Sequence, residues 1–411
     1  MASIAVIGAG ISGLTAAYYL SRRHDVTLFE ENNYLGGHTD THEIVVGGAE
    51  ISVDTGFIVF NDRTYPHFIL LLTDLGCAFA PTEMSFSVKH SSMDLEYNGH
   101  NLNTLFCQRR NLIRPSFLVM VSDILRFNRA AQMLSENEKR SLGDYLVEER
   151  YSESFQNNYL LPMAAAIWST GSEPVKQFPI LMLARFFIHH GLVDLKNRPQ
   201  WQIVTGGSNN YIRQLKKHLG TVHLSLKVTQ VSRNADHVTV VGEDYSSDFD
   251  QVVIATHSDQ ALTLLSDPTK QETSILGDIT YTSNHVKLHT DTSVMPKRRL
   301  AWASWNYNLD SNTSRASLTY YVNRLQHLTC AESVFVTLND DNGIEDEKVI
   351  KELCYRHPYY DHRALAAQAR CCEISGQGGT HYAGAYWGNG FHEDGVMSAL
   401  RVCKNLGVET C

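Results

Sequence analysis

Hydrophobic positions near the start of the chain follow the order strand, helix, strand. Residues 4–7 form a short, mostly β-branched run that predicts a buried strand, and an Ala- and Leu-rich pattern with helical spacing covers residues 11–20. A second apolar run at residues 26–29 ends on an acidic residue, Glu30. Three glycines spaced Gly-x-Gly-x-x-Gly separate the first strand from the helix. This order predicts a βαβ unit with a tight glycine turn.

The three glycines and the acidic residue have the spacing of a dinucleotide-binding site. Gly8 permits a sharp turn, Gly10 lets a pyrophosphate approach the backbone, and Gly13 lets the helix pack closely on the strand. The helix N-terminus offers unpaired N–H donors and partial positive charge to phosphate groups. Glu30 is placed to accept hydrogen bonds from an adenosine ribose with a free 2′-hydroxyl. We therefore expect a nucleotide site at this turn.

The residues after Glu30 favour FAD over NAD as the nucleotide. An NAD dehydrogenase would continue into another βα unit here, whereas this chain has the glycine pair Gly36-Gly37, a hairpin pattern around residues 47–48 and the strand end Asp54-Thr55-Gly56. FAD is the longer molecule and needs a second set of close backbone approaches. No second Gly-x-Gly-x-x-Gly precedes a helix, so a separate NAD(P)H domain is not expected.

The rest of the chain alternates between helical and strand patterns. A helical pattern covers residues 64–75, and residues 105–200 are mostly helical. A strand over 222–231 and a buried apolar run within 249–256 indicate a return to the nucleotide domain. Residues 278–338 alternate as the strands of an antiparallel sheet.

Composition and charge exclude several classes of protein. The chain is 43% hydrophobic and 19% charged, as in ordinary globular proteins, and its net charge of −9 argues against a nucleic-acid-binding protein. No run of about 18 apolar residues is present, and a strand begins by residue 3, which leaves no room for a signal peptide. The eight cysteines show no CxxC and no paired spacing, so we expect reduced thiols in a cytoplasmic protein.

One helical segment has a basic edge. Arg109, Arg110 and Arg114 precede the apolar pattern of residues 117–125. This pattern favours a helix that faces the core of the substrate domain, with a helix that contacts a membrane surface as the alternative.

Several motifs together resemble a known superfamily. The glycine turn, Leu35-Gly36-Gly37-His38, Val53-Asp54-Thr55-Gly56-Phe57 and the strand Asp250 to Thr256 are similar to the FAD site of the flavin amine oxidase and phytoene desaturase superfamily. The resemblance implies FAD as cofactor and an α/β fold, in which a Rossmann-type FAD-binding domain of glutathione-reductase-like topology is interleaved with an α+β substrate domain. We expect FAD-binding segments at 1–75, 201–262 and 371–411, and substrate-domain segments at 76–200 (mostly helical) and 263–370 (antiparallel sheet).

The resemblance also extends to the C-terminal segment. Ala383-Gly384 precedes Ala385, where the superfamily usually has an acid, so either Glu393 or Asp394 replaces that acid or the contact is lost. A helix is expected to start near Gly395 with its N-terminus toward the flavin, and His38 stands where the superfamily usually has arginine. Spacing and resemblance together predict these cofactor-binding residues: Gly8, Gly10, Ile11, Ser12, Gly13, Glu30, Glu31, Gly36, Gly37, His38, Thr39, Thr55, Gly56, Phe57, Val228, Ala255, Thr256, Gly384, Ala385, Glu393, Asp394, Gly395 and Val396.

Candidate catalytic residues are few. Lys287 lies on a predicted strand where many amine oxidases hold a water with lysine, and a solvated strand lysine is the alternative. Tyr386 and Trp387 are candidates for an aromatic wall beside the flavin, with core packing as the alternative. His257 and His289 fit structural roles, and the other histidines lack a metal-ligand pattern, so no metal is expected.

The chain is similar over its whole length to a bacterial subgroup of predicted NAD/FAD-binding proteins whose genes often accompany cyclopropane fatty-acid synthase-like proteins. That resemblance implies an FAD-dependent oxidoreductase that takes a hydride from an apolar substrate, such as a fatty-acyl chain, as a desaturase or isomerase. Two alternatives remain: a flavin amine oxidase acting on small amines with O2 as acceptor, and a non-catalytic FAD- or NAD-binding protein. The expected partner is a small hydrophobic molecule and no nucleic acid is expected, while a peripheral membrane contact stays open as the alternative for the helix with the basic edge.

Overall fold

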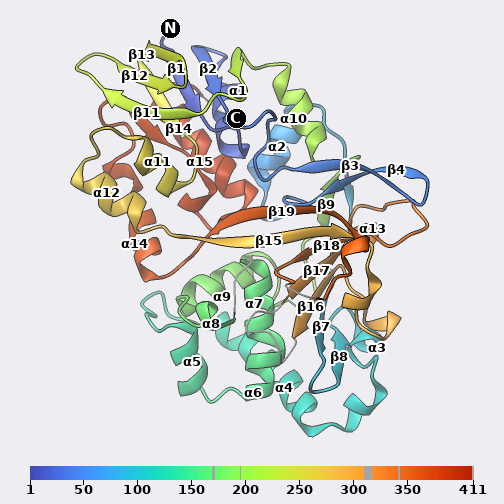
Figure 1. Cartoon of the computed structure of the whole chain (residues 1–411). Helices are drawn as coiled ribbons and strands as arrows, with labels where there is room; N and C mark the ends of the chain where they lie inside the picture. Colours follow the sequence, from blue (N-terminus) through green and yellow to red (C-terminus); the bar gives the residue numbers. More distant parts are fainter. Residues whose placement is uncertain (169–171, 195, 310–316, 341–342, 410–411) are drawn as a thin grey trace.

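The computed structural model describes residues 1–168, 172–194, 196–309, 317–340 and 343–409. Figure 1 shows two halves: the upper half is built on a parallel sheet, and the lower half on a larger, mostly antiparallel sheet with helices against it. Both termini lie in the upper half.

The upper half contains a five-stranded sheet in which all four strand pairings are parallel. Its central strand is apolar and almost fully buried, as a parallel strand covered on both faces requires. The strand order is β10 (Thr221–His223), β2 (Asp25–Phe29), β1 (Ser3–Ile7), β14 (Gln251–Ile254) and β20 (Thr380–Tyr382). The chain thus returns to this sheet three times, at β10, β14 and β20.

Helices α1 (Ile11–Leu20) and α15 (His392–Asn405) pack against each other beside this sheet. A three-stranded antiparallel sheet of β11 (Val228–Arg233), β12 (Val238–Gly242) and β13 (Tyr245–Phe249) contributes to a second apolar core with β14. The strand predicted over 222–231 is therefore two strands. Ser225 has a positive φ of 53° at the turn that divides it, so β10 joins the parallel sheet and β11 the antiparallel one.

The lower half is organised around a seven-stranded sheet. Its pairings are antiparallel except that β16 runs parallel to β7. Its order is β19 (Val349–Pro358), β15 (Tyr281–His289), β18 (Phe335–Leu338), β17 (Ser317–Tyr321), β16 (Trp305–Leu309), β7 (Phe86–His90) and β8 (Leu95–Asn98). The sequence pattern missed β19, because its residues are largely polar and none is fully buried.

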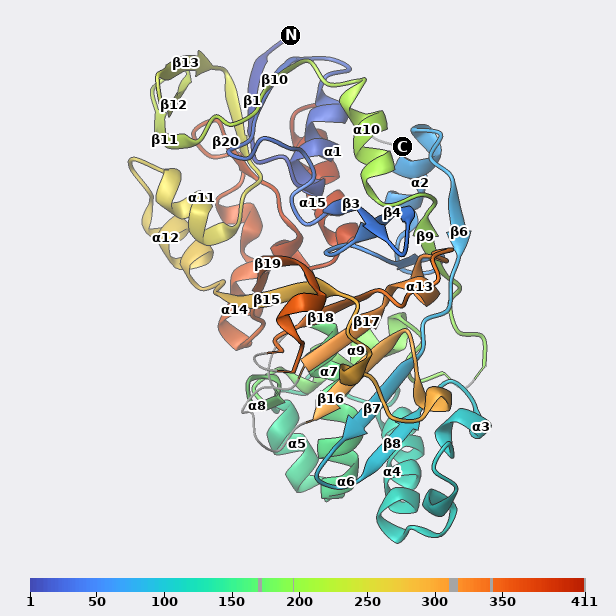
Figure 2. The ribbon, with the colours of Figure 1, turned by 45° about the vertical axis from the view of Figure 1, so that its right-hand side comes forward.

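The remaining elements complete the two halves (Figure 2). The hairpin β3 (Thr41–Val46) and β4 (Ala49–Asp54) and the small sheet of β5 (Phe60–Asn61), β9 (Trp201–Val204) and β6 (Phe79–Pro81) lie near the boundary. The other helices are α2 (Pro66–Asp74), α3 (Leu102–Leu105), α4 (Pro115–Ala131), α5 (Leu142–Glu148), α6 (Glu153–Phe155), α7 (Leu161–Ile167), α8 (Ser172–Val175), α9 (Ile180–His189), α10 (Asn209–Lys216), α11 (Ser258–Leu264), α12 (Lys270–Gly277), α13 (Val322–Leu325) and α14 (His362–Ala369).

Candidate cofactor and substrate site

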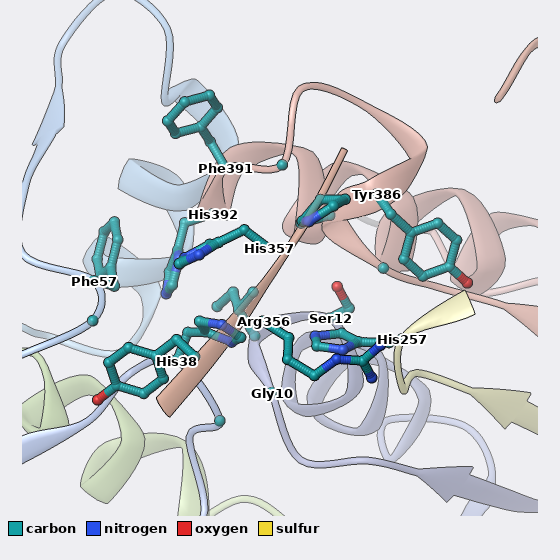
Figure 3. A pocket seen from close by; sticks show the side chains of 18 of the residues that line it. Gly10, Ser12, His38, Phe57, His257, Arg356, His357, Tyr386, Phe391 and His392 are labelled. Carbon is teal, nitrogen blue, oxygen red and sulfur yellow. The ribbon is translucent and has the colours of Figure 1, made fainter. Parts of the chain in front are cut away.

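A cavity of about 900 Å³ is lined by residues of both halves. Figure 3 shows Gly10 and Ser12 of the glycine turn on one side of it and Phe57, Phe391 and His392 on another. The cavity thus extends from the predicted nucleotide turn to the N-terminus of α15.

The glycine turn has the geometry that its spacing predicts. Gly8 has a positive φ of 98°, and its N–H donates to the carbonyl of Phe29 at 2.8 Å. A Cβ on Gly13 would lie 1.9 Å from the carbonyl oxygen of Gly8, whereas a Cβ on Gly10 would meet no protein atom within 4 Å. Gly13 therefore permits close packing, and Gly10 leaves open space at the cavity beside the N-terminus of α1.

Two further close backbone approaches lie next to this turn. Gly37 has a positive φ of 58°, and a Cβ there would lie 3.1 Å from the Cα of Gly10. A Cβ on Gly56 would lie 2.2 Å from the carbonyl oxygen of His38, which accepts the N–H of Phe57 at 2.8 Å. Glycines thus bring the Gly36-Gly37 and Thr55-Gly56 segments together at the cavity.

Three histidine rings cluster at the cavity. The ring of His38 lies 5.9 Å from that of His257 and 5.3 Å from that of His357. Burial lowers the pKa of all three, to about 4 for His257 and about 3 for His357. Nε2 of His38 and Nδ1 of His257 are buried without a hydrogen-bond partner. Arg356 lies beside them and donates to Asp259 at 2.6 Å (Figure 3).

The helix α15 begins at His392, three residues earlier than expected. The ring of His392 stacks on Phe57 with centroids 3.4 Å apart, and its Nε2 lies 3.0 Å from the Thr39 hydroxyl and 3.1 Å from the Tyr211 hydroxyl. His392 lines the cavity, so a buried imidazole stands at this helix end.

Glu393 and Asp394 do not replace the missing acid, which corrects that expectation. Glu393 accepts the N–H groups of His67 and Phe68 at 3.0 and 2.9 Å and so caps the start of α2. Asp394 accepts the N–H of Phe391 at 2.9 Å and caps α15 itself, and burial raises its pKa to about 6. Both carboxylates are used within the protein, and neither lines the cavity.

Most of the other predicted residues line the cavity: Gly8, Gly10, Ile11, Ser12, Glu30, Glu31, Gly36, Gly37, His38, Thr55, Gly56, Phe57, Val228, Ala255, Thr256, Gly384, Ala385 and Tyr386. Gly13, Thr39, Gly395, Val396 and Trp387 lie behind this lining. A Cβ on Gly395 would lie 2.7 Å from Ile11, so this glycine serves the contact between α15 and α1. Glu30 accepts the N–H of Ala9 at 2.8 Å.

Lys287 does not line the cavity, so the lysine hypothesis does not fit the structure. Its Nζ lies 3.7 Å from Glu352 on the adjacent strand β19. His289 is also away from the cavity, where its Nε2 contacts the hydroxyl of Thr337 at 2.7 Å. His289 thus has the structural role of its alternative, and the side chain of Lys287 is 20% exposed beside Glu352.

The sequence missed a group of cavity residues on β19. Tyr355, Arg356 and His357 all line the cavity, although their strand was not predicted. Nδ1 of His357 lies 2.9 Å from Nδ2 of Asn284, whose Oδ1 accepts from Asn339. This contact places the proton of the neutral ring on Nε2.

The part of the cavity in the lower half is an aromatic chamber, which we call the substrate chamber. Its walls come from α7, α9, β9, β16, β17 and the segment before α15. Among its lining residues are Met163, Ile167, Trp168, Phe186, His190, Leu192, Trp201, Trp305, Tyr320 and Phe391.

His190 is a polar group within this apolar chamber. Its ring stacks on Phe186 with centroids 3.8 Å apart, and its Nδ1 lies 3.0 Å from the carbonyl oxygen of Phe186. That contact requires the proton on Nδ1, so Nε2 is the lone-pair nitrogen. Burial lowers the pKa of His190 to about 4, which keeps the imidazole neutral at pH 7.

The sequence profile of the family described as flavin containing amine oxidoreductase matches residues 11–357. The chain belongs to the flavin containing amine oxidoreductase family. It is an FAD-dependent oxidoreductase with the predicted α/β fold. Probable polyamine oxidase 4 of Arabidopsis thaliana is 27% identical over an alignment of 267 residues, with 61% of this chain and 50% of that protein covered. The chain thus spans about half the length of this curated relative.

Solved structures share the fold of this flavin oxidoreductase over nearly all of both chains. Cyclohexylamine oxidase from Brevibacterium oxydans IH-35A is 15% identical, with 99% of each chain covered and a TM-score of 0.70. The CLA-producing fatty acid isomerase from P. acnes is 14% identical, with 98% of each chain covered and a TM-score of 0.68. Putrescine oxidase bound to putrescine is 15% identical, with 99% of each chain covered and a TM-score of 0.68. At such identities the likeness shows the fold alone.

The cavity of this flavin oxidoreductase fits FAD in two respects. Gly10 leaves free space beside the N-terminus of α1, where a pyrophosphate fits against the helix end. Nε2 of His38 and Nδ1 of His257 are buried without partners, as expected where a polar ligand completes the hydrogen bonds. The residues present therefore suit the cofactor.

Three further observations on the described ranges concern metal ligands, cysteines and membrane-spanning helices. No group of three or more His, Cys, Asp or Glu residues there could hold a metal ion. The seven described cysteines are free, and Cys411 lies outside the described residues. Within the same ranges, no helix is both long enough and apolar enough to cross a membrane.

Proposed function

We propose that this flavin oxidoreductase acts on a fatty-acyl or similar lipid chain, from which it removes a hydride to form or move a double bond. The observation that carries the proposal is the character of the substrate chamber. Aromatic and aliphatic side chains form its walls, and none of its described lining residues is a carboxylate. Such a chamber favours an apolar chain.

The carboxylates that do line the cavity lie elsewhere. Glu30 and Glu31 follow β2 at the nucleotide end, and Asp259 forms an ion pair with Arg356 at 2.6 Å. A diamine or polyamine would bring a second ammonium group into the chamber, and a buried ammonium without a counter-charge is strongly disfavoured. The location of the acids therefore argues against polyamines.

We assign the cofactor's parts to the lining residues as follows. Glu30 binds the adenosine ribose and Val228 contacts adenine, while Gly10, Ser12 and the N-terminus of α1 bind the pyrophosphate. His38 and His257 would contact the same pyrophosphate, in place of the arginine that the superfamily usually has at position 38. Gly56, Phe57, Ala385, Tyr386 and His392 would hold the flavin ring, because they line the rest of the cavity.

We assign to His190 the role of proton acceptor in this reaction. Bound FAD supplies the hydride acceptor. As the carbon–hydrogen bond beside the hydride donor breaks, its proton moves to Nε2 of His190 and its electron pair forms the carbon–carbon double bond. The neutral state of His190 at pH 7 and its place in an apolar wall support this role.

Oxidation of a small monoamine is the second candidate. The family profile and the 27% identity to a probable polyamine oxidase favour it. Aromatic walls also suit a neutral amine, which needs no counter-charge.

Product analysis separates the two candidates. The purified FAD-loaded enzyme is incubated with fatty acids and phospholipids, and the acyl chains are analysed by mass spectrometry for loss of two hydrogens or a shifted double bond. Parallel reactions with cyclohexylamine and putrescine are assayed for peroxide. An altered acyl chain supports the proposal, whereas peroxide from amines with unchanged lipids refutes it.

The variant His190→Phe tests the assigned proton acceptor, with His189→Phe as the matched control on the exposed neighbouring residue. We expect the first to lower kcat about 100-fold, within the range of general acid–base catalysis, and to leave FAD content unchanged. The control retains activity. Equal activity of both variants would remove His190 from the mechanism.

A further inference from the structure

Exposed apolar residues and positive charge coincide at the lower end of the molecule. We define the basic tip as residues 101–119 and 297–300. It comprises α3, the turn η1 (Arg109–Ile113), the start of α4 and the segment leading into η4 (Arg299–Ala301). The segment η4 packs against α3 and β8, so the two stretches are neighbours. Figures 1 and 2 place this tip in the half opposite both termini.

The basic tip departs from the charge of the whole protein. It holds six Arg or Lys residues and no Asp or Glu, in a chain with a net charge of −9. Two carboxylates just outside it form ion pairs, Asp94 with Arg110 at 2.6 Å and Glu96 with Arg298 at 3.1 Å. Positive charge therefore remains in excess at this surface.

Large apolar side chains are exposed among these cations. Ile113 is 83% exposed, Leu102 75% and Leu112 51%, and Leu118, Val119 and Leu300 are also exposed. The opposite face of α4 buries Phe117, Met120 and Phe127 in the core of the lower half. The core-facing interpretation of this helix thus holds for one face, and contact with a membrane stays a prediction for the other.

We propose that the basic tip docks on an anionic lipid bilayer, with its aliphatic side chains inserted at the interface and its cations among the head groups. Apolar residues flanked by arginine and lysine have the composition of a peripheral membrane contact. A second copy of this chain is a poor occupant, because a symmetric dimer would place the same six cations against each other. Docking is independent of the proposed substrate, but it would bring the enzyme to a source of acyl chains.

Vesicle co-sedimentation of the FAD-loaded enzyme tests this surface. We compare vesicles of phosphatidylcholine with 30% phosphatidylglycerol against vesicles of phosphatidylcholine alone, at about 0.1 M and 0.5 M salt. Anionic vesicles should bind the enzyme at low salt, and at high salt binding should weaken because screening shortens the range of the charges. Equal binding to both vesicle types, or none to either, overturns the proposal.

Two variants and a control locate the contact. Leu112→Ser with Ile113→Ser removes exposed apolar groups, and Arg109→Gln with Lys297→Gln removes exposed charges. Each double variant should lower the vesicle partition coefficient about tenfold or more. Val147→Ser, at a residue of α5 that is 71% exposed, is the control and should bind as the unaltered enzyme does. FAD content and Tm verify folding. Unchanged vesicle binding in both double variants contradicts the proposal. A change that the double variants show only in self-association, measured by light scattering, contradicts it as well.

Discussion

Binding of FAD should be coupled to protonation of His257. In the absence of FAD, burial lowers the pKa of this imidazole to about 4, helped by the neighbouring His38 ring and by Arg356 and opposed by Asp259. A single phosphate charge about 4 Å from the ring, at an effective dielectric of about 20, stabilises the imidazolium by about 4 kcal/mol. That energy equals about three pKa units. The pKa of His257 should therefore rise to about 7 when FAD binds.

The sign of the pH dependence follows from this rise. The group takes up a proton on binding, so affinity is highest at low pH and is lost as pH rises through the bound-state pKa. Between pH 8 and pH 6 the Kd for FAD should fall about tenfold. Quenching of flavin fluorescence on titrating the deflavinated protein measures this Kd at each pH.

Two controls decide whether His257 is responsible. His257→Gln should flatten the pH dependence, while His362→Gln, at an exposed residue outside the cavity, should leave it unchanged. Riboflavin lacks the pyrophosphate and should show no such dependence. A tenfold change that persists in His257→Gln, or that appears equally with riboflavin, would refute the reasoning.

Three further predictions concern packing, the lysine and acid stability. Gly10→Ala should fold with a Tm close to that of the unaltered protein but bind FAD at least about tenfold more weakly. Gly13→Ala should lower both Tm and FAD content, because its Cβ would lie 1.9 Å from the Gly8 carbonyl oxygen. Thermal melts and flavin absorbance compare the two variants. Lys287→Ala should change stability by less than about 1 kcal/mol, because its partner Glu352 is 68% exposed, and should change kcat less than about twofold. A larger loss of kcat in steady-state assays would restore a catalytic role for Lys287. The deflavinated protein should lose stability as pH falls from 6.5 towards 4, because the unfolded chain takes up protons on its histidines first. The loss should be about 2 kcal/mol at pH 5 for each buried histidine whose folded pKa is about 4. Urea melts at pH 7 and pH 5 measure this loss, and equal stability would contradict the burial of neutral imidazoles.

The parts of the site built from local sequence patterns could be predicted. Glycines that tolerate a positive φ or a close contact shape three segments of the site: the turn from Gly8 to Gly13, Gly36-Gly37 and Thr55-Gly56. Each of these segments contributes lining residues to the cavity, as expected. The FAD cofactor, the enzyme class and the α/β fold predicted from them are confirmed by the family profile and the shared fold.

Features that depend on tertiary partners could not be predicted. Glu393 has the position of a cofactor ligand in the sequence, but the start of α2 happens to lie within reach of its carboxylate. Strand β19 pairs with β15 although its residues lack an apolar alternation, so His357 and Arg356 were missed. The histidine cluster joins residues 38, 257 and 357, which no spacing rule connects.

The most direct test of the proposed substrate class is anaerobic reduction of the enzyme-bound flavin, followed by its absorbance near 450 nm in a stopped-flow instrument. Vesicles of phospholipid with monounsaturated chains should bleach the flavin, and the rate should fall about 100-fold in His190→Phe. Cyclohexylamine and putrescine at the same concentration should leave the absorbance unchanged. Rapid bleaching by either amine, with none by lipid, would contradict an apolar acyl substrate and return the enzyme to the amine oxidases.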